Sequence, residues 1–466
     1  MNMLTCTLDS DSRILLYEQL YLFIKSEIRS GKIPCHTKLP SKRRLSSHLK
    51  ISQNTIQTAY EQLAEEGYIE SIERSGFYVN KLENVIKLDI EEPSRIIDSQ
   101  DSLLAVDYDF SYHGVDLNTF PYTTWRKLFK EVINEDDEEL LLLGDPRGHL
   151  SLRSCIAEYL HQSRGVNCYA SQIIINSGTE FLFQILIQLL DEDSIYGIEN
   201  PGYEKLNLLF STNQAKFRAI DIDDDGMKLE EIAKTESNIL CITPAHQFPS
   251  GQVMPINRRA QILNWANGKD DRYIIEDDYD SEFKYSGKPI PSLQGLDNND
   301  KVIYMGSFSK SLSPSLRISY MVLPAHLLAR YMEKLSYISC PVPMMDQKVL
   351  ARFMEDGHFE KHLNKMRTIY KKKRELLVKA IKRWNTGMEV LGAEAGLHLL
   401  LRVNNGMTEE ELELAALLNK VKVYGVSKYD ADLKKLDDRG TVLIGYATKK
   451  ESDIDMAVSR LHQAWF

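Results

Sequence analysis

Two side chains able to carry chemistry stand at the ends of apolar, β-rich runs in the second half of this chain. Asp277 lies at the carboxyl end of the run RYIIEDDY, and Lys310 follows the run KVIYMGSF. In an open α/β sheet the ligand crevice lies outside the carboxyl ends of the strands, so we expect both side chains to converge there. A lysine near a carboxylate is most often a simple ion pair, so the surrounding residues must decide what this pair does.

The residues around this pair match the needs of pyridoxal phosphate. That cofactor requires an amine for a Schiff base, an anion at its pyridine nitrogen, a hydrogen-bond donor at its phenolic oxygen and a cradle for its phosphate. Lys310 offers the amine, Asp277 the anion and Tyr279 the donor. Free backbone N–H groups at a helix start and the fixed charge of an arginine both suit a phosphate dianion. The remaining candidates are Tyr203, which can stack on the ring, and the phosphate set Ser177, Gly178, Thr179, Ser307, Ser309 and Arg317.

The elements that must position these residues alternate between strands and helices. Apolar runs such as QIIINSG, SIYGIENP and NILCITP recur between longer helical stretches from about residue 106 onward. This pattern predicts an α/β domain over residues 106–466, with a large, mostly parallel sheet covered on both faces. From about residue 346 the chain is helix-rich and charged and then ends in strands, which predicts a smaller α+β lobe over about 346–466. The basic run at 371–374 is typical of a solvated helix face.

The first 80 residues predict a separate winged helix-turn-helix domain. Helical spacing over 13–30, 42–50 and 53–67 is followed by two short strands, and Ser41 and Ser52 are placed to cap the second and third helices. The third helix starts with small polar side chains that suit base edges, and the segment before the second helix is basic. Residues 81–105 lack strong periodicity and predict a linker. The predicted DNA-binding residues are Lys42, Arg43, Arg44, Ser52, Gln53, Asn54, Thr55, Gln57, Arg74 and Gly76.

Composition and charge exclude several classes of protein. The chain has 466 residues and a net charge of -10, which argues against a protein that coats nucleic acid over its whole surface. Residues 1–80 nevertheless hold ten Lys and Arg against nine Asp and Glu, whereas the rest holds 47 against 58. The sequence shows no membrane-length apolar run and no secretory signal, so we expect a cytoplasmic protein without membrane contact. Six scattered cysteines predict reduced, mostly buried thiols and no metal site.

Two stretches of the chain resemble known families. Nearly all of residues 14–80 closely resemble the DNA-binding domain of GntR-family bacterial regulators. The segments that carry this resemblance are LYEQLYLFIKSEIRSGKI, TKLPSKRRLSSHLKISQNTIQTAYEQLAEEGYIES and GFYV. Roughly residues 108–466 resemble the aspartate-aminotransferase-like, type I fold of pyridoxal-phosphate enzymes. The segments that carry this resemblance are GDPRGHLSLR, NSGTE, ENPGY, TPAHQFPSG, EDDYDSEF and SFSKSLSPSLR. The fusion of the two is similar to the MocR/GabR group of transcription regulators.

This resemblance implies a regulator that binds pyridoxal phosphate at Lys310 and acts mainly as a ligand sensor. It further implies a domain-swapped, head-to-tail homodimer on operator DNA with repeated half-sites, and it places His246 and Gln247 near the cofactor's phenolic oxygen. Lys205 and Lys428 stand where the GABA-responsive branch uses arginines on the effector carboxylate, so GABA itself is not implied. The family's tyrosine before the GDPRG segment is also replaced, because Leu142 and Leu143 precede Gly144 there, and one phosphate or dimer contact is lost.

We therefore expect a transcription regulator whose cofactor pocket senses an amine or amino acid, or pyridoxal phosphate itself. The alternative is a working aminotransferase with a vestigial DNA-binding domain, because sensing and transamination share the first half-reaction. The GntR-like segment favours the regulator, since an enzyme has no need to keep it.

Overall fold

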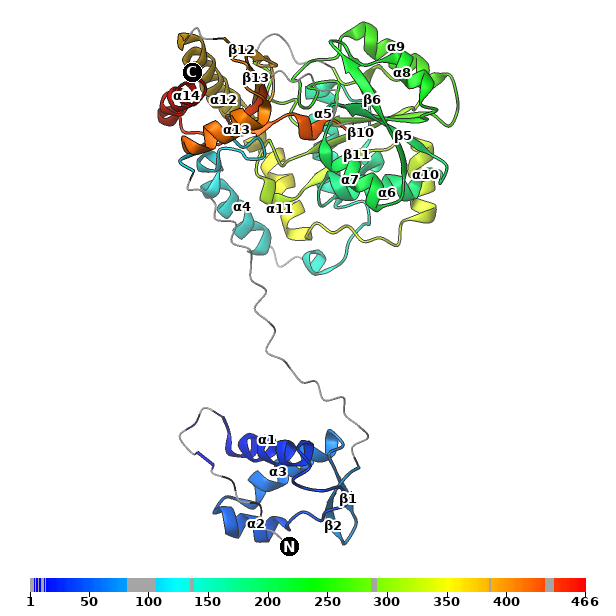
Figure 1. The fold of residues 1–466 in the computed structure, drawn as a ribbon. Helices are drawn as coiled ribbons and strands as arrows, with labels where there is room; N and C mark the ends of the chain where they lie inside the picture. The colour runs from blue at the N-terminus through cyan, green and yellow to red at the C-terminus, as the bar shows by residue number, and fades with distance from the viewer. Residues whose placement is uncertain are drawn as a thin grey trace. The chain divides into compact units, whose positions relative to one another are not determined.

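The computed structural model describes residues 14–81, 106–134, 138–285, 291–384, 387–431 and 440–466, together with residues 4, 6, 8, 9 and 12. The chain divides into two compact units, Met1–Asp101 and Ser102–Phe466 (Figure 1). Apart from residue 81, the predicted linker at 81–105 lies outside the described residues.

The first unit is built from three helices and a hairpin around one apolar core. Its elements are α1 (Leu16–Arg29), α2 (Lys42–Leu49), α3 (Gln53–Glu65), β1 (Ile69–Ile72) and β2 (Gly76–Val79). The two caps predicted from the sequence are present: Ser41 Oγ accepts the backbone N–H of Arg44, and Ser52 Oγ accepts that of Thr55. Fully buried side chains from all three helices form the core, among them Leu20, Ile24, Leu45, Ile56, Tyr60 and Leu63.

The second unit is organised around an eight-stranded sheet with the order β4-β11-β10-β9-β8-β5-β6-β7. β11 runs antiparallel to both of its neighbours and β7 antiparallel to β6, whereas the other pairs are parallel, so the sheet is mostly parallel, as predicted. The strands are β4 (Ile173–Asn176), β5 (Ile195–Asn200), β6 (Lys216–Asp223), β7 (Gly226–Met227), β8 (Ile239–Ile242), β9 (Tyr273–Asp278), β10 (Val302–Ser307) and β11 (Ser319–Val322).

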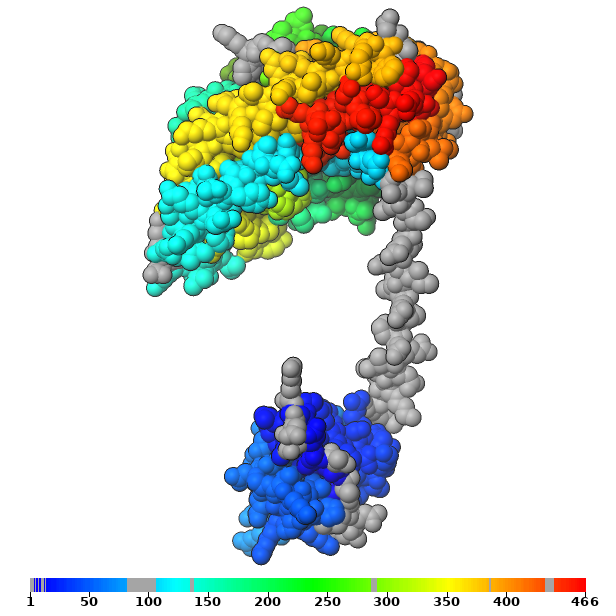
Figure 2. Space-filling view, turned by 90° about the vertical axis from the view of Figure 1, so that its left-hand side faces the viewer, coloured from blue at the N-terminus to red at the C-terminus, as the bar shows by residue number. Residues whose placement is uncertain are grey.

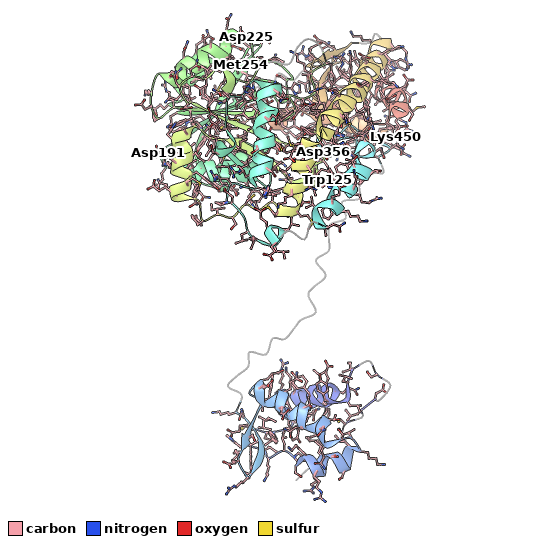
Figure 3. The ribbon with its side chains drawn as sticks, turned by 180° about the vertical axis from the view of Figure 1, so that it is seen from behind. Trp125, Asp191, Asp225, Met254, Asp356 and Lys450 are labelled. Atoms are coloured by element: carbon pink, nitrogen blue, oxygen red, sulfur yellow. The ribbon has the colours of Figure 1, made fainter. Side chains whose placement is uncertain are left out.

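Helices cover both faces of this sheet because its strands are apolar on both sides. On β4, Ile174 packs in one cluster with α6 and α10, whereas Ile173 and Ile175 pack in another with α5 and α11. Trp125 of α4, labelled in Figure 3, contacts Phe353 of α11 edge to face. The helices are α4 (Tyr122–Asn134), α5 (Leu150–Arg164), α6 (Thr179–Leu189), α7 (Glu204–Thr212), α8 (Leu229–Lys234), α9 (Ile256–Asn267), α10 (Ala325–Lys334) and α11 (Met344–Glu355).

A smaller lobe packs beside the large one around an antiparallel sheet with the order β12-β13-β16-β15. Its strands are β12 (Met388–Leu391), β13 (His398–Val403), β15 (Tyr424–Gly425) and β16 (Thr441–Gly445), and its helices are α12 (His358–Trp384), α13 (Glu409–Leu418) and α14 (Glu451–Trp465). The predicted boundary near residue 346 falls inside α11, whose buried face belongs to the core of the large lobe.

The small lobe also takes in the first described residues of the second unit. β3 (Tyr108–Asp109) pairs in parallel with β14 (Val421–Lys422), and Phe110 and Val115 are buried in the core of the lobe. Figure 2 shows this early segment, in cyan, against the red C-terminal helix α14, where Arg460 forms an ion pair with Asp107 at 2.6 Å. Residues far apart in the sequence therefore form one lobe.

All six cysteines are free thiols, but the prediction that most of them are buried is wrong. Cys241 alone is buried, Cys35 is exposed, and the other four are half-buried. Within the described ranges, we find no helix with the length and apolar character needed to cross a membrane.

Candidate cofactor site and DNA-binding surface

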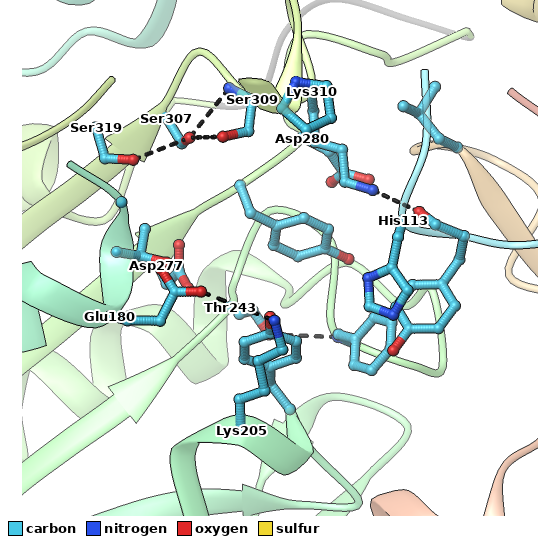
Figure 4. Close-up of a pocket in the computed structure, with 18 of the residues that line it drawn as sticks. His113, Glu180, Lys205, Thr243, Asp277, Asp280, Ser307, Ser309, Lys310 and Ser319 are labelled. Atoms are coloured by element: carbon cyan, nitrogen blue, oxygen red, sulfur yellow. Dashed lines mark hydrogen bonds and ion pairs between the residues drawn. The ribbon is translucent and has the colours of Figure 1, made fainter. Parts of the chain in front are cut away.

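The carboxyl ends of the large-lobe strands open onto a cavity of about 420 Å³, whose lining also includes Leu397 and His398 of the small lobe (Figure 4). Lys310 and Asp277 both line it, as the strand-end argument predicts. The other sequence-predicted residues that line the cavity are Gly178, Thr179, Tyr203, Lys205, Tyr279, Ser307, Ser309 and Arg317.

Lys310 is held as an amine of reduced basicity. Burial lowers the pKa of this lysine to about 8, and the charge of Asp280 offsets only part of that effect. Its Nζ donates a hydrogen bond to the backbone carbonyl of Tyr112. A pKa near 8 leaves a sizeable neutral fraction at physiological pH, and the neutral amine is the nucleophilic form.

One carboxylate oxygen of Asp277 has no hydrogen-bond partner within the described structure. Its Oδ1 is buried and accepts no hydrogen bond from the described residues. Burial, followed by the charges of Asp278 and Asp280, raises the pKa of Asp277 to about 7. A buried, unpartnered carboxylate is costly, and a protonated ring nitrogen is the kind of group that would satisfy it.

The phosphate candidates form a cradle at the start of α6. Gly178 is the N-cap residue at φ 104°, and a side chain there would overlap the guanidinium of Arg317. Ser307 Oγ donates to Ser309 Oγ at 2.9 Å and accepts from Ser319 Oγ at 3.0 Å. Hydroxyls, a helix N-terminus and an arginine together suit a dianion, so the described residues fit pyridoxal phosphate.

Ser177 of the predicted phosphate set and Lys428 of the predicted effector set do not line the cavity. Ser177 uses its backbone oxygen to accept a bond from Arg317 Nη2 at 3.4 Å. Lys428 lies over the rings of Tyr424 and Tyr429, at 5.1 and 5.0 Å from their centroids. Its charge still reaches the cavity, because it contributes to the depressed pKa of His113.

His246 and Gln247 lie behind the cavity wall. His246 Nδ1 hydrogen-bonds both the hydroxyl of Tyr279 and the carboxylate of Asp280, each at 2.9 Å. Gln247 instead bonds the backbone oxygen of Pro201 at 2.9 Å. His246, Asp280 and His398 bring ligand atoms within 4.8 Å of one another, a set that can in principle hold a metal ion.

Several residues that line the cavity were not predicted from the sequence. Asp280, Glu180 and Thr243 stand inside the quoted motifs EDDYDSEF, NSGTE and TPAHQFPSG, which could have revealed them. Tyr112 and His398 belong to no motif and reach the cavity from the small lobe side. Burial, followed by the charges of Lys310, Lys205 and Lys428, lowers the pKa of the equally unforeseen His113 to about 4. The remaining lining residues are Phe248, Pro314, Ser319 and Leu397.

The predicted DNA-binding residues gather at the starts of α2 and α3 and at the hairpin. Arg43, Arg44, Gln53 and Asn54 are exposed, as are Ser52 and Arg74. Lys42 Nζ donates to Gln57 Oε1, which joins the two helices, and Thr55 Oγ1 bonds Ser52 Oγ at 2.8 Å. In the hairpin turn, Arg74 and Gly76 both adopt positive φ, at 59° and 117°.

The fold and the cavity define a fusion of a bacterial DNA-binding domain with an aminotransferase-like domain. Residues 16–79 match the gntR family of bacterial regulatory proteins, and residues 113–461 match aminotransferase class I and II. The chain belongs to the family of GntR-type transcription regulators that carry such an aminotransferase domain. Pyridoxal phosphate is the cofactor of this aminotransferase class.

Relatives of full length support this assignment. The chain is 41% identical over 97% of both chains to the uncharacterized HTH-type transcriptional regulator YdeL of Bacillus subtilis. It is 32% identical to the probable rhizopine catabolism regulatory protein MocR of Rhizobium meliloti, over 88% of this chain and 86% of the relative. It is 29% identical to the pyridoxine biosynthesis transcriptional regulator PdxR of Corynebacterium glutamicum, over 77% of each chain.

A solved structure confirms the fold of the second unit. The multiple substrate aminotransferase of Thermococcus profundus superposes with a TM-score of 0.69 at 24% identity, over 78% of this chain and 91% of that one. The predicted type I aminotransferase-like fold with an N-terminal GntR domain is thus confirmed.

Proposed function

We propose that the second unit binds pyridoxal phosphate through Lys310 and senses an amine, an amino acid or the cofactor itself. The state of this site controls how the first unit binds operator DNA. One observation carries the proposal: Lys310, Asp277, Tyr279 and Arg317 converge on a single cavity in a chain that also has a GntR-type DNA-binding domain. Because operator DNA is the partner, we place the protein in the cytoplasm.

Each cavity residue has a role that follows from its chemistry. Lys310 would hold the cofactor through its neutral amine, and Asp277 would keep a proton on the ring nitrogen. Tyr279 donates to the phenolic oxygen and Tyr203 stacks on the ring. Bound pyridoxal phosphate supplies a reversible carbonyl chemistry toward amines. The phosphate is held by Gly178, Thr179, Ser307, Ser309 and Arg317, with the backbone of Ser177 steadying that arginine.

The segment that starts the second unit supports a route from the cavity toward the DNA-binding domain. Tyr112 accepts a hydrogen bond from Lys310 and lies only a few residues after the predicted linker. The same segment is joined to the small lobe through β3 and the Asp107–Arg460 ion pair. When the Lys310 amine binds another group, its hydrogen bond to the Tyr112 carbonyl is lost. The segment next to the linker can then change its conformation. A switch of this kind requires a ligand that favours one of two states.

The chemical class of the effector follows from the cavity wall. An effector amine would take the place of the Lys310 amine, and a carboxylate on the effector would face Lys205, while the charge of Lys428 acts on the cavity from outside its lining. Lysines offer point charges and not the planar fork of arginine, so the effector need not be GABA. The pyridoxine biosynthesis regulator among the relatives favours the cofactor itself as an alternative signal.

The assembly that fits this function is a head-to-tail homodimer, because two DNA-binding domains can read repeated half-sites. The exposed side chains of Leu141, Leu142 and Leu143 in the large lobe offer apolar surface for a second copy.

The proposal is tested with purified full-length wild type and Lys310→Ala, with Lys379→Ala, an exposed lysine of α12, as the matched control. We expect the wild type and the control to gain a visible absorbance band with pyridoxal phosphate, and their affinity for operator DNA to change with the cofactor or with one member of a panel of amines and amino acids. Lys310→Ala should show neither effect. Identical DNA binding by all three proteins under every condition would refute the sensor, and steady turnover of an amino donor and a keto acceptor would instead support the aminotransferase.

A further inference from the structure

Glu180 places a carboxylate where an incoming phosphate would be held. It is the second residue of α6, directly after the Gly178 and Thr179 cradle, and it lines the same cavity. Its Oε2 lies 3.0 Å from Arg317 Nη2, and its Oε1 lies 3.8 Å from Lys205 Nζ. A helix N-terminus and two cations are the features that attract an anionic ligand, and here a side chain of the protein already uses them.

The carboxylate of Glu180 is ionised in this setting. Burial alone would raise its pKa, but a backbone N–H and the charges of Arg317 and Lys205 outweigh burial and lower it. The three side chains are one-third to one-half exposed, so they can change partners without leaving an unsatisfied charge in the core. Figure 4 marks the ion pair between Glu180 and Lys205 with a dashed line, and both side chains line the cavity.

A phosphate and this carboxylate compete for the same guanidinium. A phosphate monoester carries a charge of about -1.5 to -2 at neutral pH, so a second anion at contact distance opposes its binding. Lys205, the second residue of helix α7, is available to Glu180 as a second cation, because it already lies within ion-pair distance at 3.8 Å.

We propose that Glu180 is an internal competitor for the cofactor's phosphate, which holds Arg317 in the cofactor-free protein and moves to Lys205 when the phosphate binds. This inference rests on the proposed function and extends it. The exchange weakens binding of the phosphorylated cofactor, so that the fraction of occupied sites follows the cofactor concentration. It also makes the ion pairing of Lys205, a predicted effector residue, depend on whether the cofactor is bound. Residues 180 and 205 thus link the phosphate end of the cavity to its effector end.

The test compares pyridoxal phosphate with pyridoxal, which lacks the phosphate, in calorimetric titrations of the cofactor-free full-length protein. Glu180→Gln should bind pyridoxal phosphate about tenfold more tightly than the wild type, because one like-charge contact is removed, and should bind pyridoxal with unchanged affinity. Glu230→Gln, which removes a first-turn acid of α8 away from the cavity, is the matched control and should bind both ligands like the wild type.

A double-mutant cycle tests the exchange itself. Lys205→Gln should weaken pyridoxal phosphate binding several-fold in the wild-type background and leave it nearly unchanged in the Glu180→Gln background. Equal or weaker binding of pyridoxal phosphate by Glu180→Gln, or an equal effect of Lys205→Gln in both backgrounds, would overturn the inference alone. If no variant, wild type included, binds pyridoxal phosphate, the proposed function fails and this inference fails with it.

Discussion

Five carboxylates crowd the end of β9 and the turn that follows, and their partners distinguish one of them. Glu276 accepts the backbone N–H groups of Leu293 and Gln294 at 2.7 and 2.9 Å. Asp278 accepts from Arg164 at 2.7 Å. Asp280 is bonded to His246. Asp277 alone in this group both faces the cavity and keeps an oxygen without a partner among the described residues, which is why we assign it to the cofactor and the others to the scaffold. Glu282 lies outside the cavity.

The raised pKa of Asp277 predicts a pH dependence of stability. The ordinary pKa of this carboxyl is 3.8 and the folded value is about 7, so the folded state retains a proton between these values. The protonated Asp277 carboxyl contributes fully to the free energy of unfolding below its pKa in the unfolded chain. This contribution is lost as the pH rises through its pKa in the folded protein. The free energy of unfolding of the cofactor-free wild type should therefore fall between about pH 4 and pH 8. In cofactor-free Asp277→Asn this fall should be smaller by on the order of a few kcal/mol.

The control for this prediction is Asp193→Asn, which alters an exposed carboxylate paired with Lys216 and should leave the pH slope unchanged. Melting curves of both variants and the wild type at several pH values provide the comparison. An Asp277→Asn slope equal to that of the wild type would show that this carboxyl does not titrate in the expected range.

At the scale of elements, the segment around β3 is held to the small lobe by a buried ion pair. Lys373 of α12 donates to Asp116 Oδ2 and to the backbone oxygen of Ala447, each at 2.7 Å, and its side chain is 3% exposed. The prediction that the whole basic run is a solvated face is therefore wrong at this position. Its neighbour Lys372 does point outward, at 63% exposure, toward Glu451.

This difference within one run of lysines predicts unequal costs of substitution. Lys373→Ala should lower the free energy of unfolding by about 3 kcal/mol, because it leaves Asp116 without its buried partner. Lys372→Ala should cost less than about 1 kcal/mol, because it breaks only an exposed pair. Denaturant titration of the full chain measures both, and hydrogen exchange over residues 106–116 should increase only in Lys373→Ala. Equal costs would mean that Asp116 finds another partner.

At the scale of the whole chain, we propose that an acidic protein binds DNA through the small basic segment that holds Lys42, Arg43 and Arg44. We expect the exposed Arg43 and Arg44 at the start of α2 to contribute affinity chiefly through phosphate contacts. Arg43→Ala and Arg44→Ala should each weaken operator binding and reduce the slope of log affinity against log salt by about 0.9 per lost phosphate contact. Arg218→Ala, in β6 of the large lobe, is the control and should change neither quantity. An unchanged salt slope in the α2 variants would place the DNA elsewhere on the first unit.

Much of this protein is determined by local sequence. Ser41 and Ser52 mark the starts of α2 and α3 because a cap needs only its own first turn, and Gly76 marks the hairpin because the turn needs positive φ. Asp277 and Lys310 were predicted to converge because parallel strands end at one edge of a sheet.

Other features were decided only by the tertiary structure. Tyr112 and His398 reach the cavity from segments that lie roughly 200 and 90 residues from Lys310, and no local pattern marks them. Lys373 is buried because the segment before α4 folds back onto α12. Burial, pairing and the shift of a pKa depend on what the rest of the chain brings to a side chain. Periodicity reveals the face on which a residue lies, but not its partner there.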